Sequence, residues 1–148
     1  MPNPILLAHL RAALMREEAA GGAKLHPYRD MVGKLTIGYG RNLDDTGITE
    51  EEARDLLDHD IQRTADALSR QLPWLTHLDE PRLGVLVDMA FNLGVEGLIQ
   101  HNPRMLGACE RGDYAAAARE MLDGPWVDQV GQRARRLALQ MRTGVWAA

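Results

Sequence analysis

Two carboxylates and a hydroxyl gather near the N-terminus of this 148-residue chain. Glu18 ends a predicted helix, Asp30 lies in a predicted turn, and Thr36 lies in the strand that follows. Two carboxyl groups facing one cleft can cleave a glycosidic bond: one protonates the leaving oxygen, and the other activates a water or stabilises the sugar cation. A hydroxyl beside them can help to hold that water. These three residues are the candidate catalytic residues.

The predicted surroundings of the two carboxylates separate their roles. The C-terminal end of a helix disfavours negative charge, which favours a protonated Glu18, as a general acid requires. Asp30 lies in a turn, where backbone N–H groups can stabilise an anion. Glu17 is an equally good carboxylate by composition, so the residues alone leave Glu17 and Glu18 as alternatives for the acid.

A helix is predicted before the first carboxylate. Asn3-Pro4 indicates its start, because Asn is a strong N-cap and Pro suits the first helical position, and Gly21-Gly22 indicates its end. Apolar residues recur at helical spacing and predict one buried stripe. The stripe consists of Leu6, Leu7, Leu10, Ala13 and Leu14.

A β-hairpin is predicted next. Residues 25–29 and 34–39 form its strands, and Asp30-Met31-Val32-Gly33 forms its turn, with Asp and Gly where turns favour them. Residues 41–47 are predicted to be a polar loop. The hairpin places Asp30 and Thr36 on one small β-containing lobe of about residues 18–49.

A long connecting helix of about residues 50–72 follows the hairpin. Thr49-Glu50-Glu51-Glu52 is a capping box that starts it, and Pro73 ends it. Beyond Pro73 the chain is predicted to be helical throughout, with starts at Asp79-Glu80-Pro81 and Asn102-Pro103. The fold class is therefore α+β, mainly α. We expect a single domain of two lobes, in which residues 73–148 and the N-terminal helix form the larger helical lobe.

Composition excludes several other functions. A formal net charge of −4 argues against a dedicated nucleic-acid binder. Cys109 is the single cysteine, so no intrachain disulfide can form, and it is interpreted as a small core residue. The five histidines show no metal-binding spacing, so we expect no bound metal. No apolar run is long enough to span a bilayer, and the N-terminus does not resemble a signal peptide. We expect a monomer made in the cytoplasm.

The segment from Pro27 to Gly40 resembles the active-site hairpin of the phage T4-type lysozymes, the endolysins of glycoside hydrolase family 24. That family has a Glu that ends the first helix, then an Asp, then a Thr in a Thr-Ile-Gly-x-Gly strand, as Thr36-Ile37-Gly38-Tyr39-Gly40 is here. Further motifs follow in family order over nearly the whole chain. They are Met89-Ala90-Phe91-Asn92-Leu93-Gly94, Arg104-Met105-Leu106, Trp126, Gln132-Arg133-Ala134-Arg135-Arg136 and Arg142-Thr143-Gly144-Val145-Trp146.

The resemblance implies a role for each matched position. It places the general acid on Glu18, the water-positioning carboxylate on Asp30 and the threonine beside the water on Thr36. It also implies that Arg133 contacts the catalytic Glu, and that the sugar cleft is lined by Phe91 and Asn102. The chain departs from the family in two places: the link of 11 residues between Glu18 and Asp30 is longer, and Arg41 replaces a frequent His. We favour Glu18 over Glu17 and assign Arg41 no catalytic role.

The resemblance implies a lysozyme-like, two-lobed fold and a muramidase that needs no cofactor. The substrate and partner of such an enzyme would be peptidoglycan, which it would cleave between N-acetylmuramic acid and N-acetylglucosamine during lysis of a bacterial host. The alternatives are a lytic transglycosylase and a non-catalytic module that binds the wall or disrupts membranes. A final helix rich in arginine, with Arg133, Arg135, Arg136 and Arg142, adds contact with an anionic envelope polymer or membrane as a further hypothesis.

Overall fold

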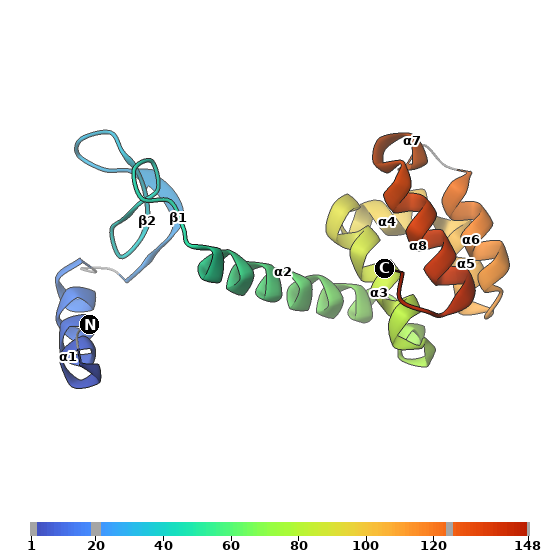
Figure 1. Cartoon of the computed structure of the whole chain (residues 1–148), viewed down its shortest axis with the longest axis horizontal. Coiled ribbons are helices and arrows are strands. Elements are labelled where there is room, and N and C mark those ends of the chain that lie inside the picture. The colour runs from blue at the N-terminus through green and yellow to red at the C-terminus, as the bar shows by residue number, and fades with distance from the viewer. Residues whose placement is uncertain (1–2, 19–21, 124–125, 148) are drawn as a thin grey trace. The chain divides into compact units, whose positions relative to one another are not determined.

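The computed structural model describes residues 3–18, 22–123 and 126–147, without the side chains of Glu18 and Gln129. The chain divides into two compact units, Met1–Arg54 (unit 1) and Asp55–Ala148 (unit 2). Unit 1 contains a three-stranded antiparallel sheet, and unit 2 is helical (Figure 1). The predicted α+β, mainly helical fold class is confirmed. The assignment of the N-terminal helix to the helical lobe stays a prediction.

Unit 1 begins with helix α1 (Pro4–Glu18). The Asn3 side chain caps it, because Asn3 Oδ1 accepts a hydrogen bond of 2.8 Å from Leu6 N. Within unit 1, no described element covers the apolar stripe on α1, and Leu6, Leu7, Leu10 and Leu14 are exposed there. The burial of this stripe against the helical lobe, to which the sequence assigns the helix, stays a prediction.

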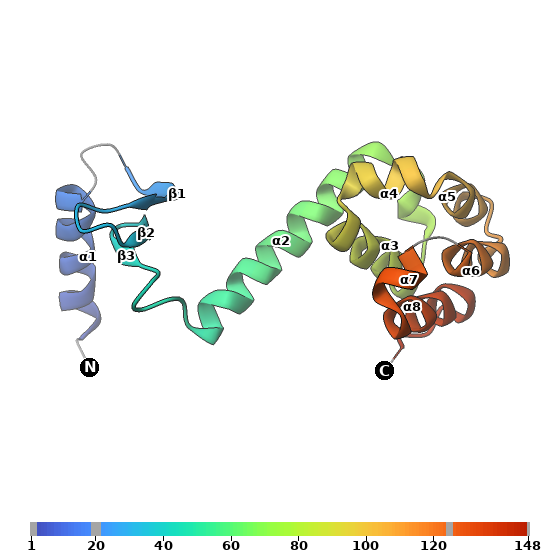
Figure 2. The ribbon, with the colours of Figure 1, turned by 90° about the horizontal axis from the view of Figure 1, so that it is seen from above.

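The sheet of unit 1 has the order β1 (Lys24–Arg29), β2 (Leu35–Gly38), β3 (Arg41–Asn42) (Figure 2). The predicted hairpin is β1–β2. The start of the predicted polar loop instead forms β3, where Arg41 pairs with Ile37. Polar contacts hold the chain there: Leu35 N donates to Asp44 Oδ2 at 2.8 Å, and Leu43 N donates to Leu35 O at 2.7 Å.

The long helix α2 (Glu50–Gln71) crosses the boundary between the units and begins with the predicted capping box. Glu52 N donates to Thr49 Oγ1 at 3.1 Å, and Thr49 N donates to Glu52 Oε2 at 2.8 Å. The apolar stripe of α2 is buried only toward its C-terminal end, at Leu68. Helix α2 therefore joins the hydrophobic core at that end.

Unit 2 is a set of short helices around one hydrophobic core. The predicted central helix is α3 (Glu80–Leu93), whose residues Val85, Leu86 and Met89 are fully buried. The other elements are η1 (Pro73–His77), α4 (Val95–His101), α5 (Pro103–Glu110), α6 (Tyr114–Leu122), α7 (Trp126–Val130) and α8 (Gln132–Thr143). Among the described residues no single helix could cross a membrane, and the bent pair α3–α4, which passes by length and composition, is part of this core.

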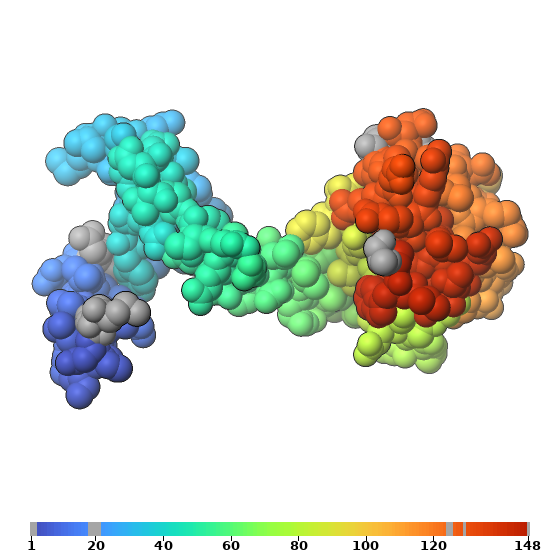
Figure 3. Space-filling view, in the orientation of Figure 1, coloured from blue at the N-terminus to red at the C-terminus, as the bar shows by residue number. Residues whose placement is uncertain are grey.

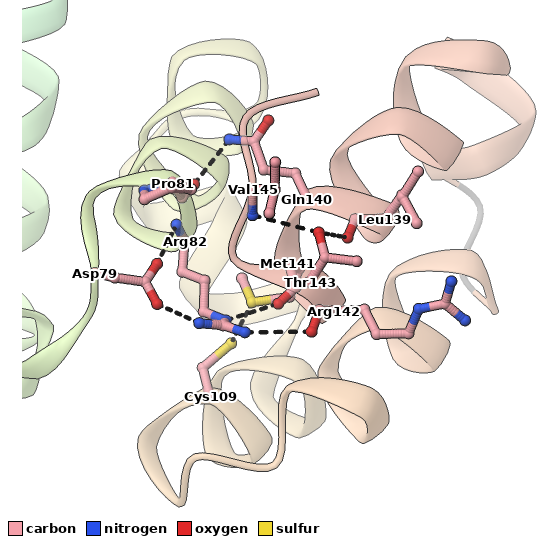
Figure 4. A network of polar contacts seen from close by, with 10 residues as sticks. All are labelled: Asp79, Pro81, Arg82, Cys109, Leu139, Gln140, Met141, Arg142, Thr143 and Val145. Carbon is pink, nitrogen blue, oxygen red and sulfur yellow. Dashed lines mark hydrogen bonds and ion pairs between the residues drawn. The ribbon is translucent and has the colours of Figure 1, made fainter. Parts of the chain in front are cut away.

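Arg82 ties the start of α3 to the end of α8 (Figure 4). Its guanidinium donates to the carbonyl of Met141 at 2.8 Å and to that of Arg142 at 3.2 Å, pairs with Asp79, and lies 3.8 Å from the centre of the Tyr114 ring. A cation at a helix C-terminus satisfies its free carbonyls and its dipole. This contact fixes the last turn of α8.

Cys109 lies inside unit 2, as predicted. Its Sγ is 3.7 Å from the sulfur atoms of Met105 and Met141. Burial raises the pKa of the Cys109 thiol to about 12, against the opposing charge of Arg82. The thiol therefore stays protonated, and Cys109 is a packing residue.

Candidate functional site

The turn between β1 and β2 holds the carboxylate of Asp30 in a fixed position. Asp30 Oδ1 accepts two backbone hydrogen bonds, from Val32 N at 3.0 Å and from Lys34 N at 2.8 Å. Gly33 closes the turn with φ at +84° and donates its N–H to Asp30 O at 3.0 Å. With Oδ1 engaged by the turn, Oδ2 accepts no hydrogen bond from the described residues and can face a reactant.

Thr36 lies on β2, the central strand, between Tyr28 of β1 and Asn42 of β3. It is 3% exposed, the one buried residue among the described residues of unit 1. Its hydroxyl donates to Lys34 O at 3.0 Å. A hydroxyl that donates one hydrogen bond can still accept from a water, because its oxygen has two lone pairs.

The backbone of Lys34 connects the two candidate residues. Its N–H donates to the Asp30 carboxylate, and its carbonyl accepts from Asp30 N at 2.9 Å and from the Thr36 hydroxyl. Asp30 and Thr36 therefore bond to the same residue, and a change in the Lys34 backbone would displace both. The structure thus brings together two of the three predicted catalytic residues.

The third predicted residue, Glu18, is the last residue of α1, which is the predicted helix end. Its side chain lies outside the part of the chain that the structure describes, as do residues 19–21. Glu17 is exposed. The assignment of the general acid to Glu18 rather than Glu17 therefore stays a prediction.

Arg41 has a structural partner that the sequence did not indicate. Its guanidinium binds both oxygens of Glu52, with Nη2–Oε1 at 2.6 Å and Nη1–Oε2 at 3.0 Å, and also donates to Gly47 O at 3.1 Å. The hydrogen bond from Arg41, with that from Thr49 N, lowers the pKa of the Glu52 carboxyl to about 2. This ion pair joins β3 to the start of α2.

In unit 2, Asn102 lines a cavity of about 550 Å³. Its apolar wall includes the indole of Trp126, which is 5% exposed and donates from Nε1 to Asn92 Oδ1 at 3.4 Å. Phe91 is exposed and does not line this cavity. The full lining is Leu93, His101, Asn102, Pro103, Arg104, Met105, Glu120, Met121, Asp123 and Trp126. Half of these ten residues are polar or charged and half are apolar, a mixture that suits an amphiphilic ligand such as a sugar.

Arg133 also has a partner that sequence reasoning missed. Its Nε and Nη2 lie 3.0 Å and 2.8 Å from Asp88 Oδ1 on α3, and both side chains are about one-third exposed. An acidic residue in the middle of the apolar run from Leu83 to Phe91 was the available signal. Asp88 offsets the positive charge of Arg133. The implied contact of Arg133 with the catalytic Glu stays a prediction.

Comparison with known proteins assigns the chain to a family. The family model described as phage lysozyme matches residues 18–142. The chain is also 34% identical over 128 residues to the pre-baseplate central spike protein Gp5 of Enterobacteria phage T4, an alignment that covers 80% of the chain and 22% of that protein. The chain therefore spans about a fifth of this relative. By the match over most of its length, the chain belongs to the phage lysozyme family.

Proposed function

We propose that the chain is an endolysin-type muramidase that hydrolyses the β-1,4 bond between N-acetylmuramic acid and N-acetylglucosamine in peptidoglycan. Its family supports a lysozyme-like, peptidoglycan-degrading activity. The observation that carries the finer proposal is the attachment of Asp30 and Thr36 to the same backbone residue, Lys34. A water held between that carboxylate and that hydroxyl is the nucleophile that an inverting glycosidase requires.

Each residue has a distinct task in this mechanism. Glu18 donates a proton to the oxygen of the leaving sugar, and the bond from that oxygen to the anomeric carbon breaks. Asp30 Oδ2 accepts a proton from the water as its oxygen attacks the opposite face of the anomeric carbon, while Thr36 orients the water. The resting enzyme returns when the proton on Asp30 is exchanged back to Glu18 through solvent.

In this proposal, residues of unit 2 bind the substrate and support the catalytic acid. Asn102 and the cavity beside it bind part of the glycan, Phe91 offers an exposed aromatic face to a sugar, and Arg133 supports the acid. The ion pair with Asp88 moderates the charge of Arg133, which reduces its tendency to strip the proton from a neighbouring carboxylic acid. We also propose that the protein is made in the host cytoplasm, acts on the wall after release, and works without a cofactor.

Product analysis tests the proposal directly. Purified peptidoglycan is digested, and the soluble fragments are analysed by mass spectrometry before and after borohydride reduction. Hydrolysis leaves N-acetylmuramic acid at a reducing end, so borohydride adds two hydrogens to each fragment. Fragments that end in 1,6-anhydro-N-acetylmuramic acid would instead indicate a lytic transglycosylase. If the folded protein releases no soluble fragments from peptidoglycan, it is a non-catalytic wall-binding module.

A further inference from the structure

A second hollow of unit 2 lies between α6 and α8, which pack against each other (Figures 1 and 2). It is a groove of about 490 Å³. Small side chains form its apolar floor, including the buried Ala118 and Ala138, and its edges carry Leu122 and Leu139, which are 44% and 48% exposed. The groove shares no lining residue with the cavity that contains Asn102.

Three arginines also line this groove: Arg119 of α6 and Arg135 and Arg142 of α8. No acidic side chain lines it. Among the described side chains, none of the three guanidinium groups forms an ion pair or a hydrogen bond, whereas Arg41, Arg82 and Arg133 are all paired with carboxylates. The groove therefore carries three positive charges that form no ion pair with the described side chains of unit 2.

The fold fixes the backbone that carries two of these charges. Arg82 holds the carbonyls of Met141 and Arg142, which anchors the last turn of α8, and Figure 4 shows the Arg142 side chain extending away from Arg82. Residues of α8 and of the C-terminal segment also form much of one face of unit 2, in red in Figure 3. Arg135 and Arg142 are therefore presented on a firmly anchored helix, which lowers the entropic cost of binding a ligand.

Charge and shape together select a ligand. Guanidinium groups bind carboxylates through two parallel hydrogen bonds, and three of them favour a ligand with several negative charges. A floor of alanines, edged by two leucines, favours small apolar groups between those charges. A short acidic peptide with alanine side chains has both properties, whereas a phosphodiester polymer offers little to the apolar floor.

We propose that the groove between α6 and α8 binds the carboxylate-bearing peptide stems of peptidoglycan, as a second contact with the wall separate from the glycan cavity. The inference rests on the proposed function, because peptide stems are present only if peptidoglycan is the substrate. The inference also gives the arginines of α8 different roles. Arg133 is held by Asp88, and Arg136 lines a different hollow, so Arg135 and Arg142 are the stem-binding residues of α8.

A binding experiment that needs no hydrolysis tests the inference. The full chain, labelled with ¹⁵N, is titrated with L-alanyl-D-isoglutamyl-diaminopimelyl-D-alanine and with the same peptide whose carboxylates are amidated. We expect shifts in the amide signals of Ala115, Ala118 and Leu139 with the acidic peptide alone. The double variant Arg135→Gln/Arg142→Gln should bind the acidic peptide at least about tenfold more weakly, since each lost charge-assisted contact weakens binding severalfold.

The matched control is Arg111→Gln, which removes one positive charge from an exposed residue of unit 2 outside the groove. It should change the dissociation constant by less than about twofold, because it removes a solvent-exposed charge, which salt screens, and leaves the guanidinium groups that line the groove in place. Equal binding by wild type and the double variant, with equal melting temperatures, would overturn the inference. So would groove shifts produced by polyphosphate or by anionic phospholipid vesicles but not by the peptide.

A kinetic comparison separates this inference from the proposed function. Wild type and the double variant are compared on intact peptidoglycan and on glycan strands freed of peptides by an amidase. We expect the double variant to show a raised KM on intact wall and unchanged kinetics on naked glycan. Peptide binding without glycan cleavage would reject the muramidase proposal and retain an acidic-peptide site, whereas cleavage without peptide binding would reject the groove inference alone.

Discussion

The folds of unit 1 and unit 2 are stabilised by different kinds of interaction. Every buried hydrophobic side chain of the described residues lies in unit 2, between Leu68 and Met141. In unit 1 the buried residue is the polar Thr36, and the sheet is fixed by hydrogen bonds such as those of Asp30 and Asp44 and by the Arg41–Glu52 ion pair. A hydrogen bond depends on the direction of its donor and acceptor, whereas the free energy of apolar burial has no direction and is roughly proportional to the buried area.

This difference suits the tasks proposed for the two units. A general base must be held at hydrogen-bonding distance from a water, and the turn at Asp30 supplies such a fixed direction. The core around Leu86 and Met89 instead supplies free energy of folding. We therefore expect substitutions in unit 1 to separate activity from stability, and substitutions in the core of unit 2 to change stability first.

The largest expected effect is on activity. Asp30→Asn should lower the rate of peptidoglycan hydrolysis by about a hundredfold to ten thousandfold, because an amide cannot accept the proton of the attacking water. The Asn oxygen can still accept the hydrogen bonds from Val32 N and Lys34 N, so the turn should persist. Hydrolysis rate and thermal unfolding are measured on the same preparations. Full activity in a folded Asp30→Asn variant would remove Asp30 from the mechanism.

The acid is tested by a matched pair of neighbouring substitutions. Glu18→Gln should lower the rate by a similar factor, about a hundredfold or more, because an amide cannot donate the proton that the leaving oxygen requires. Glu17→Gln makes the same chemical change one position earlier and should leave the rate within about twofold of wild type. The opposite result would transfer the role of general acid to Glu17.

The next effect is on the core of unit 2. Leu86→Ala should reduce the free energy of unfolding by about 2–5 kcal/mol, since it removes a fully buried side chain and leaves a cavity. The activity of the molecules that remain folded should be unchanged. Urea unfolding, with activity assayed at each denaturant concentration, checks both statements. The exposed Leu139 provides a control, because Leu139→Ala should cost less than about 1 kcal/mol.

Some features of both units could be predicted from the sequence. Those that depend on neighbours in the chain were predicted correctly: the turn at Asp30, the capping box of Thr49 and Glu52, and the N-cap at Asn3. Their partners lie two to four residues apart, so the sequence itself brings them together. The order of the family motifs then indicated which of these local structures is the candidate catalytic site.

Features that depend on tertiary contacts were not predicted. Arg41 and Glu52 are 11 residues apart and Asp88 and Arg133 are 45 apart, so no local pattern pairs them. The stripe on α1 has a related limit, because periodicity predicts an apolar face but does not identify the surface that covers it. Strand β3 was missed because two polar residues between a glycine and an acidic loop carry no strand signal.

A smaller loss of stability is expected where α3 approaches the C-terminal segment. A Cβ atom at Gly84 would lie 2.5 Å and 2.7 Å from ring carbons of Trp146, so Gly84→Ala must displace the indole; after the gain in helix propensity, the net cost should be up to about 1 kcal/mol. Gly97→Ala is the matched control, because its Cβ would meet its nearest neighbour at 3.7 Å. Alanine favours a helix over glycine, so this control should gain up to about 1 kcal/mol. Thermal unfolding of both variants measures the difference.

The smallest effect is a pH-dependent one in unit 1. The pKa of Glu52 is lowered from its ordinary value of 4.5 to about 2, so its ion pair with Arg41 contributes stability that is fully present above pH 4.5. As the pH falls toward 2, Glu52 takes up a proton, the attraction to Arg41 is lost, and this contribution disappears. Glu52→Gln removes the charge at every pH. Its melting temperature should therefore lie below that of wild type at pH 7, and the gap should close between about pH 4.5 and 2. A gap that stays constant with pH would show that packing, rather than charge, makes Glu52 important to unit 1.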